Sequence, residues 1–295
     1  MADNDDNDPQ REAEPSRRPV APALDARLGL PVPCLDHGFV RAIDYFGDDA
    51  AIVQAARVSY GKGTRKVSED RQLIRYLMRH RHTTPFEMCE IKFHVKLPIF
   101  VARQWIRHRT ANVNEISGRY SVFTDEYYTP ATENLARQSS DNKQGRGALL
   151  EGDEATRVQS DLSRHSADSY ALYQSLLSGP DLARELARMT LPVSYYTEWY
   201  WKIDLHNLLH FLALRLDPHA QYEIRVYAEA VASLVRDWVP VAWEAFEDYR
   251  LDSFNLSRQM IAAVRRMVTG EVVDRESTGL SKREWEELRT VLGQS

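Results

Sequence analysis

Apolar and polar residues alternate along residues 87–97, and this alternation is the clearest structural pattern in the chain. The apolar residues point to one side, and the polar residues between them point to the other. A period of two predicts a β-strand with one face against a core. The apolar face consists of Cys89, Ile91, Phe93, Val95 and Leu97. Because Cys89 belongs to that face, we expect its thiol to be buried and inert.

Apolar residues at helical spacing predict most of the other elements. Pro98 suits the first turn of a helix, and that helix should bury Ile99, Ala102 and Ile106, with Val101 and Trp105 beside them. Further helices are expected over residues 48–58, 68–82, 153–177, 181–189, 205–215, 221–238, 256–269 and 281–292. Strands are expected over residues 39–45 and 192–203, and a mobile polar loop over residues 133–152.

These elements indicate one mixed, helix-rich domain, with no internal repeat and no linker after residue 35. We expect a disordered tail over residues 1–30 and the domain over residues 31–295. In residues 1–18, six acidic side chains outnumber three arginines, and proline is frequent. A segment this polar cannot bury enough apolar surface to offset the entropy lost on ordering.

Composition narrows the class of protein. The 295 residues are 43% hydrophobic, which is enough for one large core or two modest ones. A formal charge of −5 argues against a bulk nucleic-acid binder. No apolar run approaches the roughly 20 residues that span a bilayer, and the N-terminus has no apolar segment of the signal-peptide type. Together with only two cysteines, Cys34 and Cys89, these features predict a cytoplasmic protein without disulfides.

Against this acidic background, residues 107–121 concentrate Arg107, Arg109 and Arg119 among small polar residues. Guanidinium groups offer five fixed donors and a permanent charge, so such a cluster suits a phosphate or an anionic base. Three alternatives remain open on these residues alone. The segment could be a solvated basic loop, a nucleic-acid-binding module that also uses Arg103, or part of a non-catalytic oligomerisation scaffold.

Two histidine pairs could begin a metal site, but neither is complete. His206 and His210 lie four residues apart on a predicted helix, without the glutamate of the metalloprotease helix and without an evident third ligand. His80 and His82 are equally isolated. We therefore predict no metal site.

Ser117 could be proposed as a nucleophile, but its surroundings do not favour that role. It lacks the strained Gly-x-Ser-x-Gly turn, and no acid that would orient a base is evident. Beside Gly118 and Arg119, its hydroxyl suits phosphate binding better, because all three can donate to oxyanions. The sequence also lacks the glycine-rich motifs of Rossmann and Walker sites, so a dinucleotide would bind without a Rossmann crevice.

The chain contains the motif RHR-x7-S, which consists of Arg107-His108-Arg109, seven further residues and Ser117. This motif is the signature of the flavin-dependent thymidylate synthases, and the chain resembles that family. The resemblance runs in the family's order over about residues 35–250. Further matching segments are Gln104-Trp105, Glu115 to Ser121, His82-x-Thr84-Pro85-Phe86-Glu87, Glu185-Leu186-Ala187-Arg188, Leu214-Arg215, and His219-Ala220-Gln221-x-Glu223-Ile224-Arg225.

The resemblance implies an α+β fold in which long helices flank a central sheet of antiparallel type. It also implies a homotetramer whose active sites are each assembled from several chains. Such an enzyme binds FAD, which NADPH reduces, and takes a one-carbon unit from methylenetetrahydrofolate to convert dUMP to dTMP. The family uses no covalent nucleophile of the enzyme, which agrees with the absence of a plausible catalytic cysteine.

The family's motifs also imply particular site residues. Arg215 would be catalytic, beside the uracil ring, where its charge would stabilise negative charge on the base. The residues implied to bind dUMP are Gln104, Trp105, Ile106, Arg107, Glu115, Ile116, Ser117, Gly118, Arg119, Arg188 (from another subunit) and Arg215. Those implied to bind FAD are Thr84, Arg107, His108, Arg109, Glu115, Asp204, Leu205, His206 and His210. Asp204 could instead only cap its helix, and His82 is a candidate for the folate or nicotinamide side.

Overall fold

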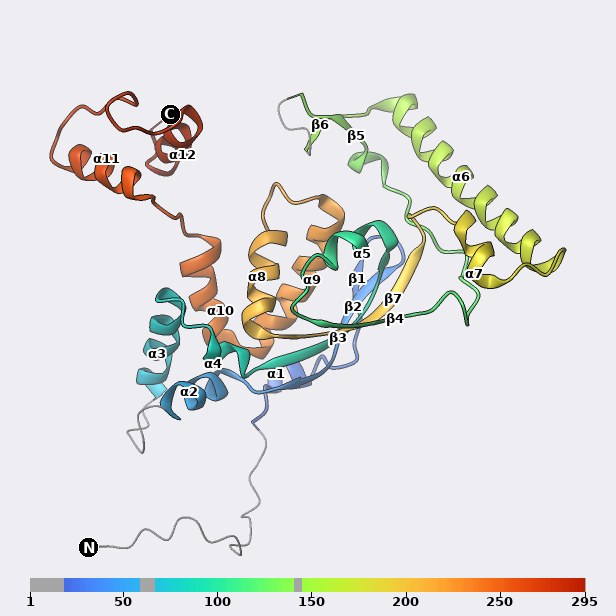
Figure 1. The fold of residues 1–295 in the computed structure, drawn as a ribbon, viewed down its shortest axis with the longest axis horizontal. Helices are drawn as coiled ribbons and strands as arrows, with labels where there is room; N and C mark the ends of the chain where they lie inside the picture. The colour runs from blue at the N-terminus through green and yellow to red at the C-terminus, as the bar shows by residue number, and fades with distance from the viewer. Residues whose placement is uncertain (1–18, 59–66, 141–144, 295) are drawn as a thin grey trace, which may run out of the picture. The chain divides into compact units, whose positions relative to one another are not determined.

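The computed structural model describes residues 19–58, 67–140 and 145–294 (Figure 1). The chain divides into two compact units, one up to Trp243 and one from Glu244 onward. The first unit contains the main sheet and every candidate site residue.

A five-stranded sheet in the order β1-β2-β3-β7-β4 organises the first unit, and all of its neighbouring strands are antiparallel. The predicted mixed fold with an antiparallel sheet is therefore confirmed. The two edge strands are short, and one of them contains Pro33. The strands are β1 (Val32–Cys34), β2 (Gly38–Phe46), β3 (Glu90–Pro98), β4 (Asn112–Glu115) and β7 (Tyr196–Asp204).

Three helices pack against one face of this sheet: α5 (Ile99–Trp105), α8 (Leu205–Arg215) and α9 (Tyr222–Trp238) (Figure 1). Trp105 lies where they meet. The centroid of its indole ring is 4.7 Å from the ring centroid of Phe211 on α8 and 5.1 Å from that of Trp201 on β7. Trp105 is also 6.1 Å from Tyr227 of α9. One buried side chain thus links all three helices to the sheet, so their ends are held in fixed relative positions.

The predicted alternation is confirmed in β3, where the residues from Ile91 to Leu97 at every second position are buried. The strand starts later than predicted because Thr84–Glu87 forms the short helix α4, with Pro85 in its first turn. The prediction that Ile106 is buried is wrong, since α5 ends at Trp105 and Ile106 is 48% exposed.

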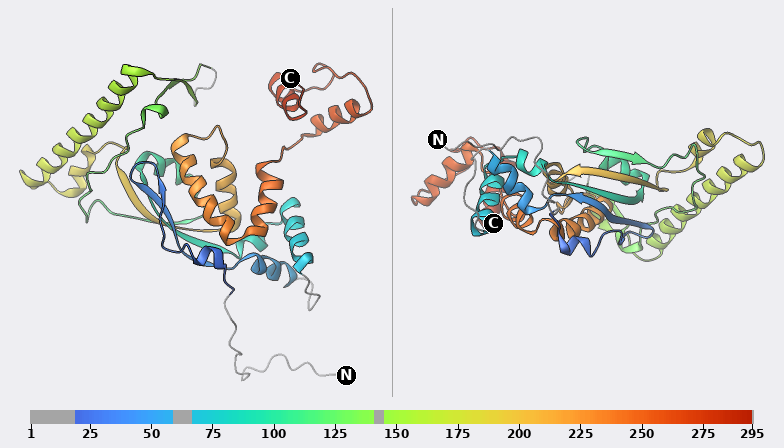
Figure 2. Two further views of the ribbon diagram at one scale, coloured as in Figure 1. Left: turned by 180° about the vertical axis from the view of Figure 1, so that it is seen from behind. Right: turned by 90° about the horizontal axis from the view of Figure 1, so that it is seen from below.

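Two groups of helices lie at opposite ends of the sheet (Figure 2). At one end are α2 (Asp49–Arg57) and α3 (Val67–Arg79), which confirm the predicted helices there, and the unpredicted α4. At the other end are α6 (Gly152–Ser178), α7 (Arg184–Ala187) and the short 3₁₀ helix η3 (Arg188–Thr190). The helix predicted over residues 181–189 is therefore real but shorter, and it is followed directly by η3.

Parts of the loop predicted over residues 133–152 form regular structure. After η2 (Thr132–Asn134), strands β5 (Ala136–Gln138) and β6 (Arg146–Leu149) form an antiparallel pair, while residues 141–144 lie outside the described residues. Arg146 Nη2 donates to both carboxylate oxygens of Glu223, at 2.5 and 2.7 Å, and Glu223 is buried at the start of α9. This ion pair anchors the hairpin to the core.

The predicted tail extends too far toward the C-terminus. Residues 1–18 lie outside the described residues, but Pro22–Asp25 forms α1, and Leu24 is fully buried. Tyr45 Oη donates to Asp25 at 2.6 Å and accepts from Ala21 N at 2.7 Å. The segment is ordered because it supplies a buried leucine and satisfies its polar groups on β2.

The second unit has its own small core. It contains the π-helical turn η4 (Glu247–Leu251) and helices α11 (Arg258–Val268) and α12 (Lys282–Val291), and the boundary between the units falls within α10 (Pro240–Phe246). The last two helices confirm the predicted ones. Ser281 and Glu284 form a reciprocal capping box at the start of α12. The core residues are Met260, Ala263, Leu280 and Leu288.

We predict that Trp105→Ala lowers the free energy of unfolding by about 3–5 kcal/mol, because it removes a fully enclosed aromatic ring. Denaturant titration followed by circular dichroism measures the change. The control is Leu172→Ala on α6, where the side chain is 50% exposed and the change should stay within about 0.5 kcal/mol. Equal effects of the two substitutions would contradict the central role of Trp105.

Candidate functional site

The loop after α5 lies along α8. Near the end of that helix, Arg215 Nε donates to His108 Nε2 at 3.1 Å, and the His108 ring is 5.0 Å from Phe211. Near its start, Thr110 Oγ1 donates to Asn207 Oδ1 at 2.8 Å. The cationic Arg107–Arg109 run is therefore fixed against a buried helix and is not a freely solvated loop. We call Arg107, His108, His210 and Arg215 the α8 group.

His108 must be neutral to make its hydrogen bond. Arginine can only donate, so Nε2 of His108 accepts and the ring proton is on Nδ1. Burial, then the nearby charges of Arg215 and His210, lower the pKa of His108 from 6.5 to about 4. Burial and the charge of Arg107 also lower the pKa of Arg215. The α8 group thus places two guanidinium charges near each other around an uncharged acceptor.

Several polar atoms near the α8 group have no partner among the described residues. Arg107 and Arg109 are exposed, and neither side chain forms a hydrogen bond or ion pair there. Gln104 Oε1 is buried without a hydrogen-bond partner. A ligand with anionic oxygens and at least one donor would satisfy these atoms.

The second set of predicted residues follows β4 in a tight turn. Ile116 N donates to Glu198 O at 2.9 Å, and Ser117 O accepts from Tyr120 N and Ser121 N, both at 3.1 Å. Ser117 Oγ accepts weakly from Arg119 N at 3.3 Å. No base contacts this hydroxyl among the described residues, so the geometry offers no activation of Ser117 as a nucleophile.

Arg188 lies beside this turn in the same chain. A Cβ atom built on Gly118 would be 3.2 Å from Arg188 Cδ, and Arg119 forms an ion pair of 3.3 Å with Glu185. Helices α7 and η3 therefore bring a second arginine to the turn. We call Ser117, Gly118, Arg119 and Arg188 the turn group.

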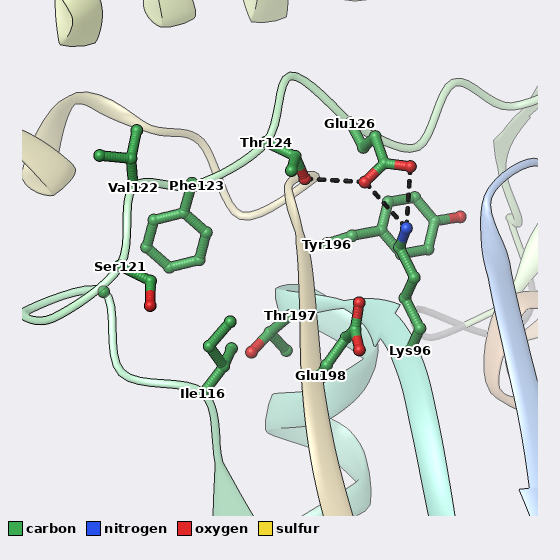
Figure 3. A pocket seen from close by; sticks show the side chains of 11 residues that line it. Lys96, Ile116, Ser121, Val122, Phe123, Thr124, Glu126, Tyr196, Thr197 and Glu198 are labelled. Atoms are coloured by element: carbon green, nitrogen blue, oxygen red, sulfur yellow. Dashed lines mark hydrogen bonds and ion pairs between the residues drawn. The ribbon is translucent and has the colours of Figure 1, made fainter.

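A cavity of about 100 Å³ lies beneath the turn, and Figure 3 shows the side chains that line it. On one side, Lys96 Nζ donates to both oxygens of Glu126 at 2.8 Å. Thr197 Oγ1 donates to Glu115 Oε1 at 2.6 Å and so fixes a carboxylate that was predicted to contact both dUMP and FAD. Sequence reasoning missed Thr197 because this contact crosses from β7 to β4 and leaves no local signal.

Thr84 and His82 lie at the opposite end of the sheet from the turn group. Both line a largely apolar cavity of about 990 Å³ bounded by α2, α3 and α4. The ring of Tyr76 is 4.3 Å from His80 and 5.9 Å from His82. Thr84 itself is exposed.

Two predicted contact residues are core residues. The side chains of Trp105 and Leu205 are buried, and Leu205 N donates to Cys89 O at 2.8 Å. Both side chains face the packed interior between α8 and the sheet, and Trp105 Nε1 has no hydrogen-bond partner among the described residues. Contact of these two residues with a ligand stays a prediction.

Asp204 caps α8, which was one of the two roles left open for it; the other was contact with FAD. Its carboxylate accepts from Asn207 N at 2.9 Å and from Asn207 Nδ2 at 2.7 Å. Of the histidines that follow on α8, His206 is half-buried and His210 is exposed. Within the described residues, no three histidine, cysteine or carboxylate side chains gather as metal ligands would.

No hydrogen bond or ion pair between described residues joins the α8 group to the turn group. Along the chain, residues 109–116, which include β4, lie between His108 and Ser117. One chain thus carries two cationic groups with no direct polar contact between them among the described residues.

Comparison with known proteins identifies relatives of the whole chain. The sequence model of the thymidylate synthase complementing protein family matches residues 41–241. Flavin-dependent thymidylate synthases of Ruegeria pomeroyi and Gluconobacter oxydans are 62% and 60% identical, each over 95% of this chain and 93% of the relative. The UMP/dUMP methylase PolB of Streptomyces cacaoi, solved with 5-Br dUMP bound, has a TM-score of 0.68 and 33% identity, covering 75% of this chain and 99% of that one. The described residues include no helix with the length and apolar character needed to cross a membrane.

We predict that acidification destabilises the protein partly through His108. Between pH 6.5 and about 4 the unfolded chain binds a proton at this residue and the folded chain does not. The stabilisation is therefore complete above pH 6.5 and is lost as the pH falls toward 4. Melting temperatures of His108→Asn should fall less steeply over that range than those of the wild type. His165→Asn, on the exposed side of α6, should keep the wild-type slope, and identical slopes for all three proteins would contradict the prediction.

Proposed function

This chain belongs to the thymidylate synthase complementing protein family, and we propose that it methylates dUMP to dTMP as a flavin-dependent thymidylate synthase. The observation that carries the proposal is the placement of the RHR-x7-S motif. Its first three residues lie against α8 beside Arg215, and its serine lies in a turn beside Arg188. Both the α8 group and the turn group present arginine side chains that can bind the anionic parts of a nucleotide.

The turn group binds the phosphate of dUMP. Ser117, Arg119 and Arg188 supply a hydroxyl and two guanidinium groups, all of which can donate hydrogen bonds to phosphate oxygens. Gln104, Arg107 and Arg215 contact the pyrimidine base. The buried amide oxygen of Gln104, which has no partner among the described residues, can accept a hydrogen bond from the base.

FAD fits the α8 group and its neighbours. Its pyrophosphate matches the exposed guanidinium groups of Arg107 and Arg109, and its ring atoms match the free Nδ1–H of His108. His206, His210 and Glu115 supply further contacts. Asp204 is a poor partner for a pyrophosphate because its carboxylate already caps the helix. When bound, FAD supplies the redox chemistry and is reduced by NADPH.

Arg215 acts through the fixed direction of its side chain. His108 accepts from Nε, so the two terminal nitrogens of Arg215, which make no hydrogen bond to described residues, can donate to the ligand. Their charge stabilises negative charge that develops on the uracil ring. Cysteine nucleophiles play no part, because burial raises the pKa of both Cys34 and Cys89 to about 12.

Methylenetetrahydrofolate is the carbon donor, and His82 contributes to the folate or nicotinamide site. The apolar cavity of about 990 Å³ that His82 and Thr84 line is large enough for a planar ring system. The complete site forms between copies of the chain in a homotetramer. No hydrogen bond or ion pair between described residues joins the α8 group to the turn group of one chain, which supports this assembly.

We predict that Arg215→Ala retains its fold and its flavin but forms dTMP at least about 100-fold more slowly, the usual loss when a donor that stabilises an anion is removed. Flavin absorbance and dUMP-dependent turnover with NADPH and methylenetetrahydrofolate measure the two properties. The matched control is Arg157→Ala on the exposed side of α6, which should retain turnover. A wild-type protein that lacks flavin and instead binds DNA with steep salt dependence would replace the enzyme assignment with the nucleic-acid alternative.

We also predict that two inactive variants restore activity when they are assembled together. Arg215→Ala damages the α8 group, and Arg188→Ala damages the turn group. If each site combines the α8 group of one copy with the turn group of another, random co-assembly leaves about one site in four intact. Turnover of the co-expressed mixture measures this fraction. A mixture as inactive as the separate variants would place each site within a single chain.

A further inference from the structure

Phe123 is held by helix α6 at both of its backbone polar groups. Its N–H donates to Tyr173 Oη at 3.3 Å, and its carbonyl oxygen accepts from Tyr170 Oη at 3.1 Å. Tyr173 is fully buried, and the Tyr170 ring stacks on Tyr195 at 6.0 Å. A residue outside any helix or strand is thus fixed to a rigid element by two side chains one turn apart.

The Phe123 ring occupies the space beside Gly118. A Cβ atom on Gly118 would overlap Phe123 Cε2 and would lie 2.9 Å from Cζ. Since Gly118 does not have a positive φ angle, its glycine is required by this close approach and not by the backbone conformation. Arg188 Cδ is 3.2 Å from the same point, so the ring, Gly118 and Arg188 pack together.

The residues after Phe123 are fixed as well. Asp125 accepts from Tyr195 Oη at 3.0 Å, and Glu126 binds Lys96 and accepts from Thr124 Oγ1 at 2.7 Å. Figure 3 shows Phe123 between Val122 and Thr124, with its ring pointing into the cavity beneath the turn. The turn itself is held mainly by its own hydrogen bonds to Ser117, by Ile116 N and by Arg184, which donates to Tyr120 O at 2.9 Å.

We infer that Phe123 is a positioning residue for the nucleotide phosphate. Its ring, fixed from α6 by Tyr170 and Tyr173, sets the positions of Gly118 and Arg188, so that the donors of the turn group are arranged before dUMP arrives. Arranging the donors in advance strengthens binding because less ordering accompanies association. The inference rests on the proposed function, since it assumes that the turn group binds dUMP.

Phe123→Ala tests the inference directly. We expect its Kd and KM for dUMP to rise about tenfold or more as the turn loses its support, while kcat changes less than about threefold. Flavin content and NADPH-driven flavin reduction should match the wild type, because the α8 group is untouched. Tyr173→Phe, which keeps the ring and deletes one anchoring hydroxyl, should change the Kd in the same direction by a smaller factor.

Tyr127→Phe is the matched control. Its hydroxyl also contacts α6, through Ser163 Oγ at 3.2 Å, but makes no contact with Phe123. If Tyr127→Phe raises the Kd for dUMP as much as Tyr173→Phe does, general loosening of α6 explains the effect and the inference is wrong. A fall in melting temperature of Phe123→Ala with an unchanged Kd for dUMP would also overturn it.

A reciprocal pair of variants tests the contact between the ring and Gly118. Gly118→Ala places a methyl group against the Phe123 ring and should weaken dUMP binding strongly. Adding Phe123→Ala makes room for that methyl group, so the double variant should bind dUMP more tightly than Gly118→Ala alone. Equal or weaker binding by the double variant would contradict the inference.

Isothermal titration of the wild-type flavoprotein with dUMP separates the two proposals. If the wild type does not bind dUMP, the proposed function and this inference fail together. If the wild type binds dUMP and Phe123→Ala binds it equally well, the proposed function stands and only the role of Phe123 is rejected.

Discussion

The enclosure of Trp105 is the constraint on which the rest of the first unit depends. Its ring touches aromatic residues from α8, α9 and β7, so the end of α5 cannot move without displacing all three. The polar loop after α5 is therefore delivered to one place along α8. A cationic segment becomes a site only when its backbone is fixed in this way, because a freely moving arginine is better solvated by water than ordered around a ligand.

The second constraint is electrostatic. Arg107 and Arg215 repel each other, and the structure brings them close around a neutral imidazole that accepts a hydrogen bond. A protonated His108 would remove that acceptor and add a third charge. Burial against Phe211 lowers the pKa of His108 and keeps its ring neutral. The packing of the core therefore also determines the charge of His108 in the polar site.

The sequence predicted features that depend on local pattern, and missed those that depend on contacts distant along the chain. The alternation from Ile91 to Leu97 sufficed for β3, and the RHR-x7-S spacing sufficed for the family. No periodicity marks the β5–β6 hairpin, whose anchor, Glu223, is 77 residues from Arg146. The contact of Phe123 with Gly118 also has no signal in the sequence. A glycine that is required by a close approach cannot be distinguished in the sequence from one that is required by a turn. Helical spacing also does not show where a helix ends. The spacing therefore placed Ile106 in the core with Trp105 beside it, whereas α5 ends at Trp105, which is buried, and Ile106 is exposed.

Both edges of the main sheet are poor templates for another strand. Strand β1 has three residues and contains Pro33, which has no N–H to donate, and β4 has four residues and is exposed and largely polar. Edge-to-edge addition, the first step of fibril growth, is therefore blocked on both sides. The two sheet edges thus disfavour open-ended association of this chain by strand pairing.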